Sequence, residues 1–168
     1  MNLDSLVRCG FQPWKPAPGV SELRVWHEYD VPTTGTFTLD NNLVLFTVVG
    51  DPDEVMSVWA YVNLTGDDAQ SARTIQFDGV ASLKDFICRA FAHRETVFAL
   101  ARGLEVWRWS RETVQGAGED DLVEAATSVL KRIKESMEQE AQRRVSPSAS
   151  FRAALADVEA AAEEFIDA

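Results

Sequence analysis

The sequence is poor in cysteine, in basic residues relative to acidic ones, and in long apolar runs. Its 168 residues include two cysteines, Cys9 and Cys88, too few and too far apart for a disulfide framework or a cysteine-based zinc site. No apolar run approaches the roughly 18–20 residues that a membrane-spanning helix requires. Residues 1–5 show no basic segment followed by an apolar one, so we expect no signal peptide and a cytoplasmic location.

Basic residues are outnumbered, 16 against 27 acidic residues, which gives a formal net charge of −11. Nucleic-acid binding depends on clustered cations, so we expect no direct contact with a phosphate backbone. Mimicry of nucleic acid stays open as an alternative, and it would require carboxylates in rows on one surface. The composition is 46% hydrophobic and 10% aromatic, which is typical of a globular domain with a dense core and argues against disorder.

The composition changes at Gln115-Gly116-Ala117-Gly118. All five tryptophans precede this point, whereas residues 119–168 are rich in alanine and carry 12 acidic against 6 basic residues. Two glycines in three residues favour a flexible joint. We therefore predict an α+β domain over residues 1–115, a Gly-rich hinge over 116–118, and an acidic helical hairpin over 119–168, with helices at about 119–144 and 147–167.

The first piece begins with a predicted pair of strands. Residues 23–31 alternate, which places Val25, His27, Tyr29 and Val31 on one face and Trp26, Glu28 and Asp30 on the other. We expect Pro32 to end this strand and residues 36–39 to form a short second one.

Turn residues and further alternation extend the sheet. Asp40-Asn41-Asn42 is typical of a tight turn, because these side chains tolerate left-handed backbone angles. Residues 43–49 are almost wholly apolar and suit a central strand, and Asp51-Pro52-Asp53 predicts another turn. In residues 55–64, Val58, Ala60, Val62 and Leu64 alternate with Trp59 and Tyr61. The pattern predicts a meander of about four antiparallel strands.

A helix and a hairpin complete the predicted domain. Ser82-Leu83-Lys84-Asp85 is typical of a capping box, and the residues that follow it at helical spacing would bury one face: Leu83, Phe86, Ile87, Ala90 and Phe91. Residues 96–100 and 104–109 are rich in strand-forming residues and meet at Arg102-Gly103. The predicted fold is thus α+β: an antiparallel β-meander with one packed helix and a closing hairpin, followed by a C-terminal helical hairpin.

The C-terminal piece carries two apolar seams at heptad spacing. The first is Val123, Ala126, Leu130, Ile133 and Met137, and the second is Phe151, Leu155, Val158, Ala162 and Phe165. Ser146-Pro147 would start the second helix. Long helices gain most of their stability from packing, so the hairpin must lie on its own domain, on a second copy of the chain or on another protein. The sequence leaves these alternatives open.

Catalytic chemistry finds little support. His27 with Glu28 and Asp30, and His93 with Glu95, are the candidates for a metal or acid–base site, but alternation separates His27 from its neighbours and a metal needs three or four converging ligands. Cys88 lacks a nearby base and is interpreted as a structural thiol. We expect no catalytic, metal or cofactor site, although a deep polar pocket around His27 or His93 would favour an enzyme.

Binding to a protein is the function we expect. Trp107 and Trp109 share a strand face and form either core or an aromatic anchor for a partner. The candidate partner-binding residues are Trp107, Trp109, Leu130, Ile133, Met137, Phe151, Leu155 and Phe165. The expected function is a non-catalytic interaction module, such as a bacterial adaptor, an antitoxin or immunity protein, or a defence-system accessory protein. It would bind a protein partner or itself, with no membrane contact, and its acidity would steer it toward a basic partner.

Three short motifs carry a family resemblance. They are Glu28-Tyr29-Asp30-x-Pro32, Trp59-x-Tyr61-Val62-x-Leu64-Thr65, and Gly79-x-x-Ser82-Leu83-Lys84-Asp85 followed directly by Phe86. With these, residues 21–101 resemble a small bacterial α+β domain family of unknown function. The resemblance implies a small α+β fold and brings no catalytic residue.

Overall fold

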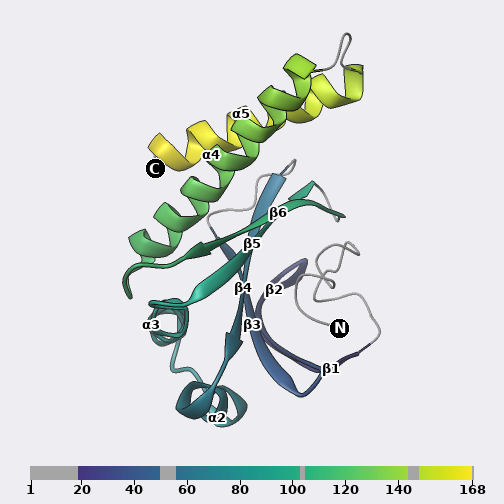
Figure 1. The fold of residues 1–168 in the computed structure, drawn as a ribbon. Helices are drawn as coiled ribbons and strands as arrows, with labels where there is room; N and C mark the ends of the chain where they lie inside the picture. Colours follow the sequence, from purple (N-terminus) through teal and green to yellow (C-terminus); the bar gives the residue numbers. More distant parts are fainter. Residues whose placement is uncertain (1–18, 50–55, 103–104, 144–147, 168) are drawn as a thin grey trace.

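The structure, a computed structural model, describes residues 19–49, 56–102, 105–143 and 148–167; for Glu105, Trp107 and residues 163–167 only the backbone is considered. Within these ranges six strands form one antiparallel sheet in chain order: β1 (Val20–Tyr29), β2 (Val31–Leu39), β3 (Asn42–Val49), β4 (Met56–Leu64), β5 (Glu95–Arg102) and β6 (Glu105–Thr113). Helices α2 (Gly66–Thr74) and α3 (Val80–Phe91) come between β4 and β5, and α4 (Glu119–Arg143) and α5 (Ala149–Asp167) follow β6 (Figure 1).

The predicted α+β class, the meander and the C-terminal helical pair are confirmed. The structure adds one helix, α2, to the single packed helix that the sequence predicts. This helix is short and polar and buries one residue, Ala72, so its apolar pattern is too weak to predict a helix from the sequence. No helix in the described part of the chain has the length and apolarity needed to cross a membrane.

Both faces of the sheet are apolar, because side chains alternate between them along each strand. One face lies under the helices, and its core includes Leu45, Val58, Val62 and Phe98 together with buried residues of all four helices. The other face carries a separate cluster: Phe37, Leu39, Val44, Phe46, Trp59, Tyr61, Val97, Ala99 and Ala101. The predicted alternation in β4 is confirmed, since Val58, Ala60, Val62 and Leu64 belong to the first core and Trp59 and Tyr61 to the second.

The predicted turn between β2 and β3 is confirmed. Asp40 and Asn41 have φ values of 47° and 68°, the left-handed conformation of a tight hairpin, and Leu39 pairs with Asn42 across them. The turn therefore fixes the whole register of this hairpin, in which Thr34 faces Thr47. The predicted turn over residues 51–53 and the junction at Gly103 lie outside the described residues.

Strand β1 differs from its prediction in two ways. Pro32 does not end a long strand; β1 ends at Tyr29, Asp30 turns the chain with a φ of 57°, and Pro32 lies near the start of β2, where a missing N–H is tolerated. The register also shifts between Val25 and His27. The extra residue lets Trp26 and His27 both reach the helix-covered face, whereas strict alternation predicts opposite faces.

The apolar face predicted for α3 is confirmed, and its predicted cap is wrong. Leu83, Phe86, Ile87, Ala90 and Phe91 are the buried residues of the helix. The helix, however, begins at Val80 behind Gly79, and the Ser82 hydroxyl donates a hydrogen bond to the Gly79 carbonyl (2.9 Å) instead of capping a backbone N–H.

The C-terminal helices pack on the sheet of the same chain. In α4 the buried residues are Leu122, Ala125, Ala126, Val129, Leu130, Ile133 and Met137, a stripe wider than the predicted seam because α4 contacts both β6 and α5. Ala154, Val158 and Ala162 of α5 belong to the same core. Of the alternatives that the sequence leaves open, the structure shows packing within the chain.

The starts of both helices depend on short polar contacts. At α4, Asp121 Oδ2 accepts a hydrogen bond from Gly118 N (2.8 Å), and a Cβ added to Gly116 would lie 2.5 Å from the same oxygen. The side chain of Asp121 thus packs against both glycines, and the hinge over residues 116–118 stays a prediction. At α5, Ser148 Oγ accepts from Phe151 N (3.2 Å) and acts as the cap, whereas Ser146 and Pro147, predicted for that role, lie outside the described residues.

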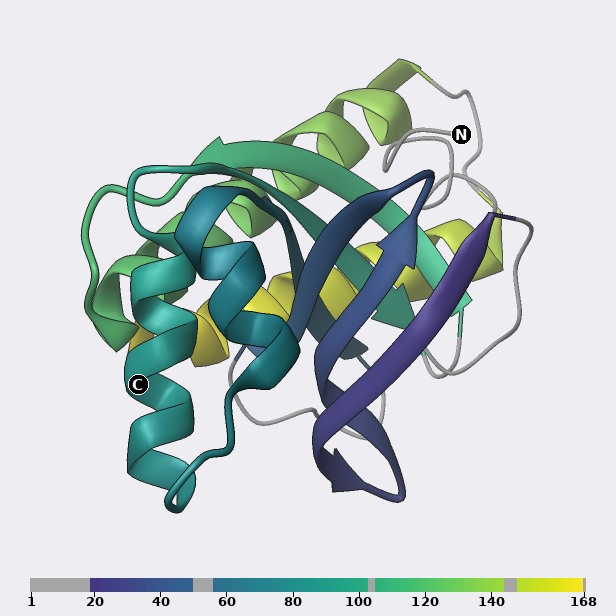
Figure 2. The same cartoon turned by 90° about the horizontal axis from the view of Figure 1, so that it is seen from below.

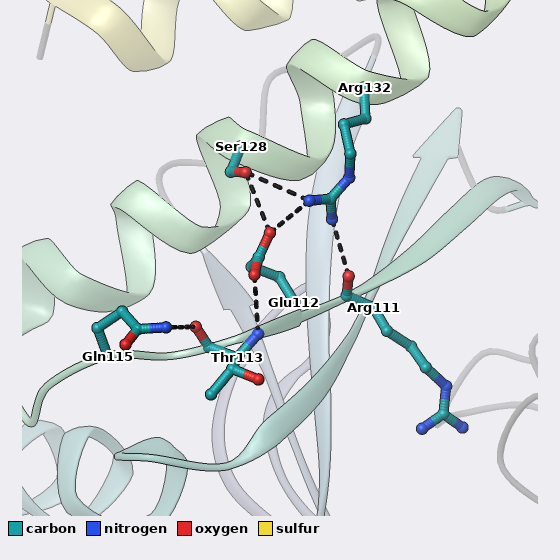
Figure 3. Close-up of polar contacts among 6 residues, drawn as sticks. All are labelled: Arg111, Glu112, Thr113, Gln115, Ser128 and Arg132. Atoms are coloured by element: carbon teal, nitrogen blue, oxygen red, sulfur yellow. Dashed lines mark hydrogen bonds and ion pairs between the residues drawn. The ribbon is translucent and has the colours of Figure 1, made fainter.

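A polar cluster joins α4 to the edge strand β6 (Figure 3). The Glu112 carboxylate points from β6 toward the helix, where it accepts hydrogen bonds from Ser128 Oγ (3.1 Å) and from Arg132. Arg132 Nη2 also donates to the Arg111 carbonyl (2.8 Å). The Arg132 bond and the other polar contacts lower the pKa of Glu112 against the opposing effect of burial.

Candidate functional site

A cavity of about 450 Å³ lies on the helix-covered face, where the N-terminal parts of α3 and α4 meet strands β1 to β3. Its volume is in the range of small-molecule sites. The apolar part of the wall consists of Val48, Val49, Val80, Leu83, Ile87, Leu122 and Val123. The polar part consists of His27, Thr34, Thr47, Lys84, Cys88 and Glu119.

The strand register places three polar side chains of the cavity wall in a row across the sheet. His27 pairs with Thr34 and Thr34 pairs with Thr47, so the three side chains cross β1, β2 and β3 side by side. The next residues in the row, Ala60 and Phe98, are apolar and belong to the core. Thr34 and Thr47 are 6% and 4% exposed, so two hydroxyls are buried exactly where the helices leave space.

The hydrogen bonds of the two threonines leave acceptor capacity in the cavity. Thr47 Oγ1 donates to the Val48 carbonyl (3.3 Å), and the two threonine hydroxyls lie 3.0 Å apart. Each hydroxyl has one proton and two lone pairs. With the proton of Thr47 on the carbonyl, Thr34 is the donor in the pair, and both lone pairs of Thr34 Oγ1 are left as acceptors.

The same count of protons and lone pairs indicates the tautomer of His27. The Thr33 hydroxyl donates its only proton to the His27 carbonyl (3.1 Å), and the same oxygen lies 2.8 Å from His27 Nδ1. Nδ1 must therefore carry the proton and donate to Thr33. With the proton on Nδ1, the other ring nitrogen, Nε2, is an acceptor on a ring that lines the cavity.

The charged side chains that line the cavity are Lys84 and Glu119, which pair with each other. Lys84 Nζ of α3 bonds both carboxylate oxygens of Glu119 at the start of α4 (2.9 and 3.2 Å), and both side chains are more than half exposed. Glu119, Asp85 and Asp121 all act electrostatically on Cys88, against Lys84 alone. At the Cys88 thiol the acidic side chains therefore outweigh Lys84.

Cys88 lies in the cavity wall as a protonated thiol. Burial raises its pKa, and the carboxylates of Glu119 and Asp85 raise it further against the opposing effect of Lys84. A nucleophilic cysteine requires the reverse, an electropositive setting that favours the thiolate. The cavity thus contains a histidine, as a catalytic site near His27 would, but its thiol is not activated.

No group of three or more His, Cys, Asp or Glu side chains that could hold a metal ion occurs among the described residues. His93 lies at the end of α3 with a φ of 57°, as a helix-end residue, and Glu95 is ion-paired with Arg111. Neither lines the cavity, so the two predicted His–Glu groups are not brought together. The cavity does lie around His27, where a polar pocket would favour an enzyme, and its described residues offer hydrogen-bond acceptors beside an apolar wall.

A second feature is the edge strand β1, shown in purple at the outer side of the sheet in Figure 2. Within the described residues it pairs only with β2. Leu23, Val25 and Tyr29 on this strand are 43%, 37% and 74% exposed, and the fourth large exposed apolar residue in this part of the chain is Val80.

The predicted partner-binding residues are placed as follows. Leu130, Ile133 and Met137 are buried under α4, and Phe151 and Leu155 of α5 are partly buried against the same core. Trp109 packs against the second cluster of the sheet, on the face opposite to Arg108. Trp107 lies where the β5–β6 register shifts, and the side chains of Trp107 and Phe165 are outside the described part.

Sequence reasoning missed most of the cavity, including Thr34, Thr47, Lys84 and Glu119. One signal was present, since Thr47 interrupts an almost wholly apolar strand. Comparison with family models, with curated proteins and with solved structures gives no match. The resemblance of residues 21–101 to a bacterial domain family therefore stays a prediction, and the sites are interpreted from their own geometry.

Proposed function

We propose that this chain is a non-catalytic protein-binding module whose partner adds an extended, basic segment along β1. The observation that supports this proposal is the position of the exposed apolar residues. Three of the four in the described part lie on this one edge strand, whose outer side pairs with no other described strand. Extended peptides bind such edges through main-chain hydrogen bonds, with side chains giving specificity.

Charge favours a basic partner. Glu22 and Glu28 lie on β1 and Asp30 follows it, whereas the one arginine of the strand, Arg24, is held on the C-terminal carbonyls of α2. The strand therefore presents carboxylates among its exposed apolar residues. With a net charge of −11 on the chain, long-range attraction would speed the encounter with a basic segment.

Self-association along β1 is less favoured than a different partner. An antiparallel pair of β1 strands centred on Val25 would place Glu22 opposite Glu28 of the second copy. Like charges directly opposite one another destabilise a strand pair. The register shifts in β1 also distort its edge, a feature that limits pairing between identical edges.

Mimicry of nucleic acid gains no support from the ion pairs. Six carboxylates of the described residues are paired with cations of the same chain, for example Asp157 with Arg102 and Glu140 with Arg108. A phosphate mimic needs its carboxylates free and in rows. An adaptor, an antitoxin or immunity protein, and a defence accessory protein would each use the β1 surface, and the partner's identity distinguishes them.

The test compares the intact chain with a Leu23→Lys/Tyr29→Ser variant in quantitative affinity capture from the host. Ala153→Lys is the control, because Ala153 is an exposed apolar residue of α5 and lies outside β1 and the cavity wall. The proposal expects a partner retained by the chain and the control but lost from the double variant, and expects a synthetic copy of the partner's basic segment to protect β1 amides from hydrogen exchange. Equal retention by the double variant would overturn it, as would a stable dimer in light scattering that both β1 substitutions dissociate.

A further inference from the structure

The cavity between α3, α4 and the sheet leads to an inference independent of the β1 surface. We infer that it binds a small amphipathic cation, a molecule with an apolar body and a protonated amine that donates hydrogen bonds. The inference rests on which groups the cavity offers and which it lacks. It concerns a small ligand and does not depend on the proposed protein partner.

The polar groups on the sheet are acceptors. If the Thr47 proton goes to the Val48 carbonyl, Thr34 donates to Thr47 and keeps both lone pairs; if the Thr33 proton goes to the His27 carbonyl, Nδ1 of His27 donates to Thr33 and Nε2 is left as an acceptor. An ammonium has three donors and no acceptor, so it matches these groups. A carboxylate, which only accepts, would face lone pairs from both residues.

The burial of the Thr34 and Thr47 hydroxyls is a second argument for a ligand site. Thr34 and Thr47 are more than nine-tenths buried and line the cavity, on a sheet face whose neighbouring rows are filled by Leu45, Val49 and Val58. Buried hydroxyls cost stability unless they are hydrogen-bonded, and the same space filled by aliphatic side chains would not. Buried polar residues in the wall of a cavity between the helices and the sheet are therefore expected of a ligand site.

The carboxylate of Glu119 supplies negative charge at the rim of the cavity. Glu119, with Asp85 and Asp121 nearby, outweighs Lys84 in the field at Cys88, which lies in the cavity wall. A ligand ammonium would compete with Lys84 for Glu119, whose side chain is 64% exposed and able to move. The apolar wall, which includes Leu83, Ile87 and Leu122, would cover the rest of the molecule.

The experiment titrates the full-length, ¹⁵N-labelled chain with hexylammonium, 1-hexanol and hexanoate, three probes with one apolar chain and different head groups. We expect saturable shifts at cavity residues with hexylammonium, and binding about tenfold or more tighter than that of hexanoate. In a Cys9→Ser background, hexylammonium should also slow the alkylation of Cys88. Hexanoate binding as tightly as hexylammonium, or no saturable shift with any probe, would overturn the inference.

Two pairs of variants separate recognition from folding. Thr34→Val/Thr47→Val removes both hydroxyls with shape retained and should abolish the preference for the amine, whereas Thr36→Val, buried on the same face of β2 but outside the cavity wall, should not. Glu119→Gln should weaken hexylammonium about threefold, with Glu124→Gln as the exposed control on α4. An unchanged preference in the double valine variant, with the fold intact, contradicts the assignment of the threonines.

Discussion

The carboxylate of Glu112 on β6 accepts a hydrogen bond from the guanidinium of Arg132 on α4, across the contact that joins the C-terminal helices to the sheet. Because this bond lowers the pKa of Glu112, the folded chain holds the proton of this carboxyl less readily than the unfolded chain does. The stabilisation is complete above the ordinary glutamate pKa of about 4.3 and is lost as the pH falls through the folded value.

We therefore predict that Glu112→Gln removes about 0.5–1 kcal/mol of stability at pH 7, a modest amount because Arg132 is 44% exposed on its side chain. Urea denaturation of the variant and the parent at several pH values is the measurement. The difference should shrink toward pH 3. Glu135→Gln, exposed on α4, is the control, and an equal loss there would contradict the specific role of Glu112.

Met137 tests whether α4 and α5 are part of the core. Its side chain is 1% exposed, so Met137→Ala should destabilise the chain by about 2–5 kcal/mol, whereas Gln139→Ala on the exposed side should change it by less than about 0.5 kcal/mol. Truncation after Gly118 should leave a chain that binds hydrophobic dyes and lacks a cooperative thermal transition. A truncated chain that unfolds cooperatively would show that residues 1–118 fold alone.

Gly35 is required by the close approach of β1 to β2. A Cβ at this position would lie 2.2 Å from the Arg24 carbonyl oxygen, a backbone atom that can move only with its strand. Gly35→Ala should therefore cost about 1–3 kcal/mol or more. Gly66→Ala is the comparison, because that site has open space and its φ of 57° lies in the left-handed region, which costs a residue with a Cβ about 1–2 kcal/mol. Denaturant midpoints measure both, and equal losses would contradict the close-approach argument.

Arg24 holds the end of α2 from a strand 48 residues earlier in the chain. Its guanidinium donates to the carbonyls of Ala72 (3.0 Å), Arg73 (2.7 Å) and Ile75 (2.6 Å). Arg24→Met keeps the aliphatic stem and should speed hydrogen exchange in α2 by about tenfold, with a smaller effect elsewhere. Arg73→Met, exposed on α2 itself, should leave exchange unchanged. A uniform change across the chain would point to global destabilisation instead.

Most of the fold could be predicted from local sequence patterns. Apolar alternation predicts the faces of β4, helical spacing predicts the buried face of α3, and Asp40-Asn41 predicts the turn that fixes the register of β2 and β3. That turn alone implies that Thr34 faces Thr47, because residues equidistant from a two-residue turn pair with each other. The pairing of the two cavity threonines could therefore be predicted from the sequence.

The rest depends on features that periodicity does not encode. An inserted residue near Trp26 changes which face its neighbours occupy, and no alternation pattern marks it. At the rim of the cavity Lys84 contacts Glu119, which is 35 residues away in the sequence. This contact forms only when α3 and α4 pack on the sheet. The wide apolar stripe of α4 likewise follows from its two neighbours rather than from its own heptads.

The chain-order arrangement of the sheet has a consequence for the newly synthesised protein. Each described strand pairs with the one made just before it, so the strands can join the sheet one after another as the polypeptide leaves the ribosome. The segment between β4 and β5 is longer because it contains α2 and α3. Helix α4, which covers β6, and helix α5 are synthesised after all six described strands. Until α4 emerges, the part of this face that α2 and α3 do not cover is open to water, and the partly made protein exposes apolar side chains that favour aggregation.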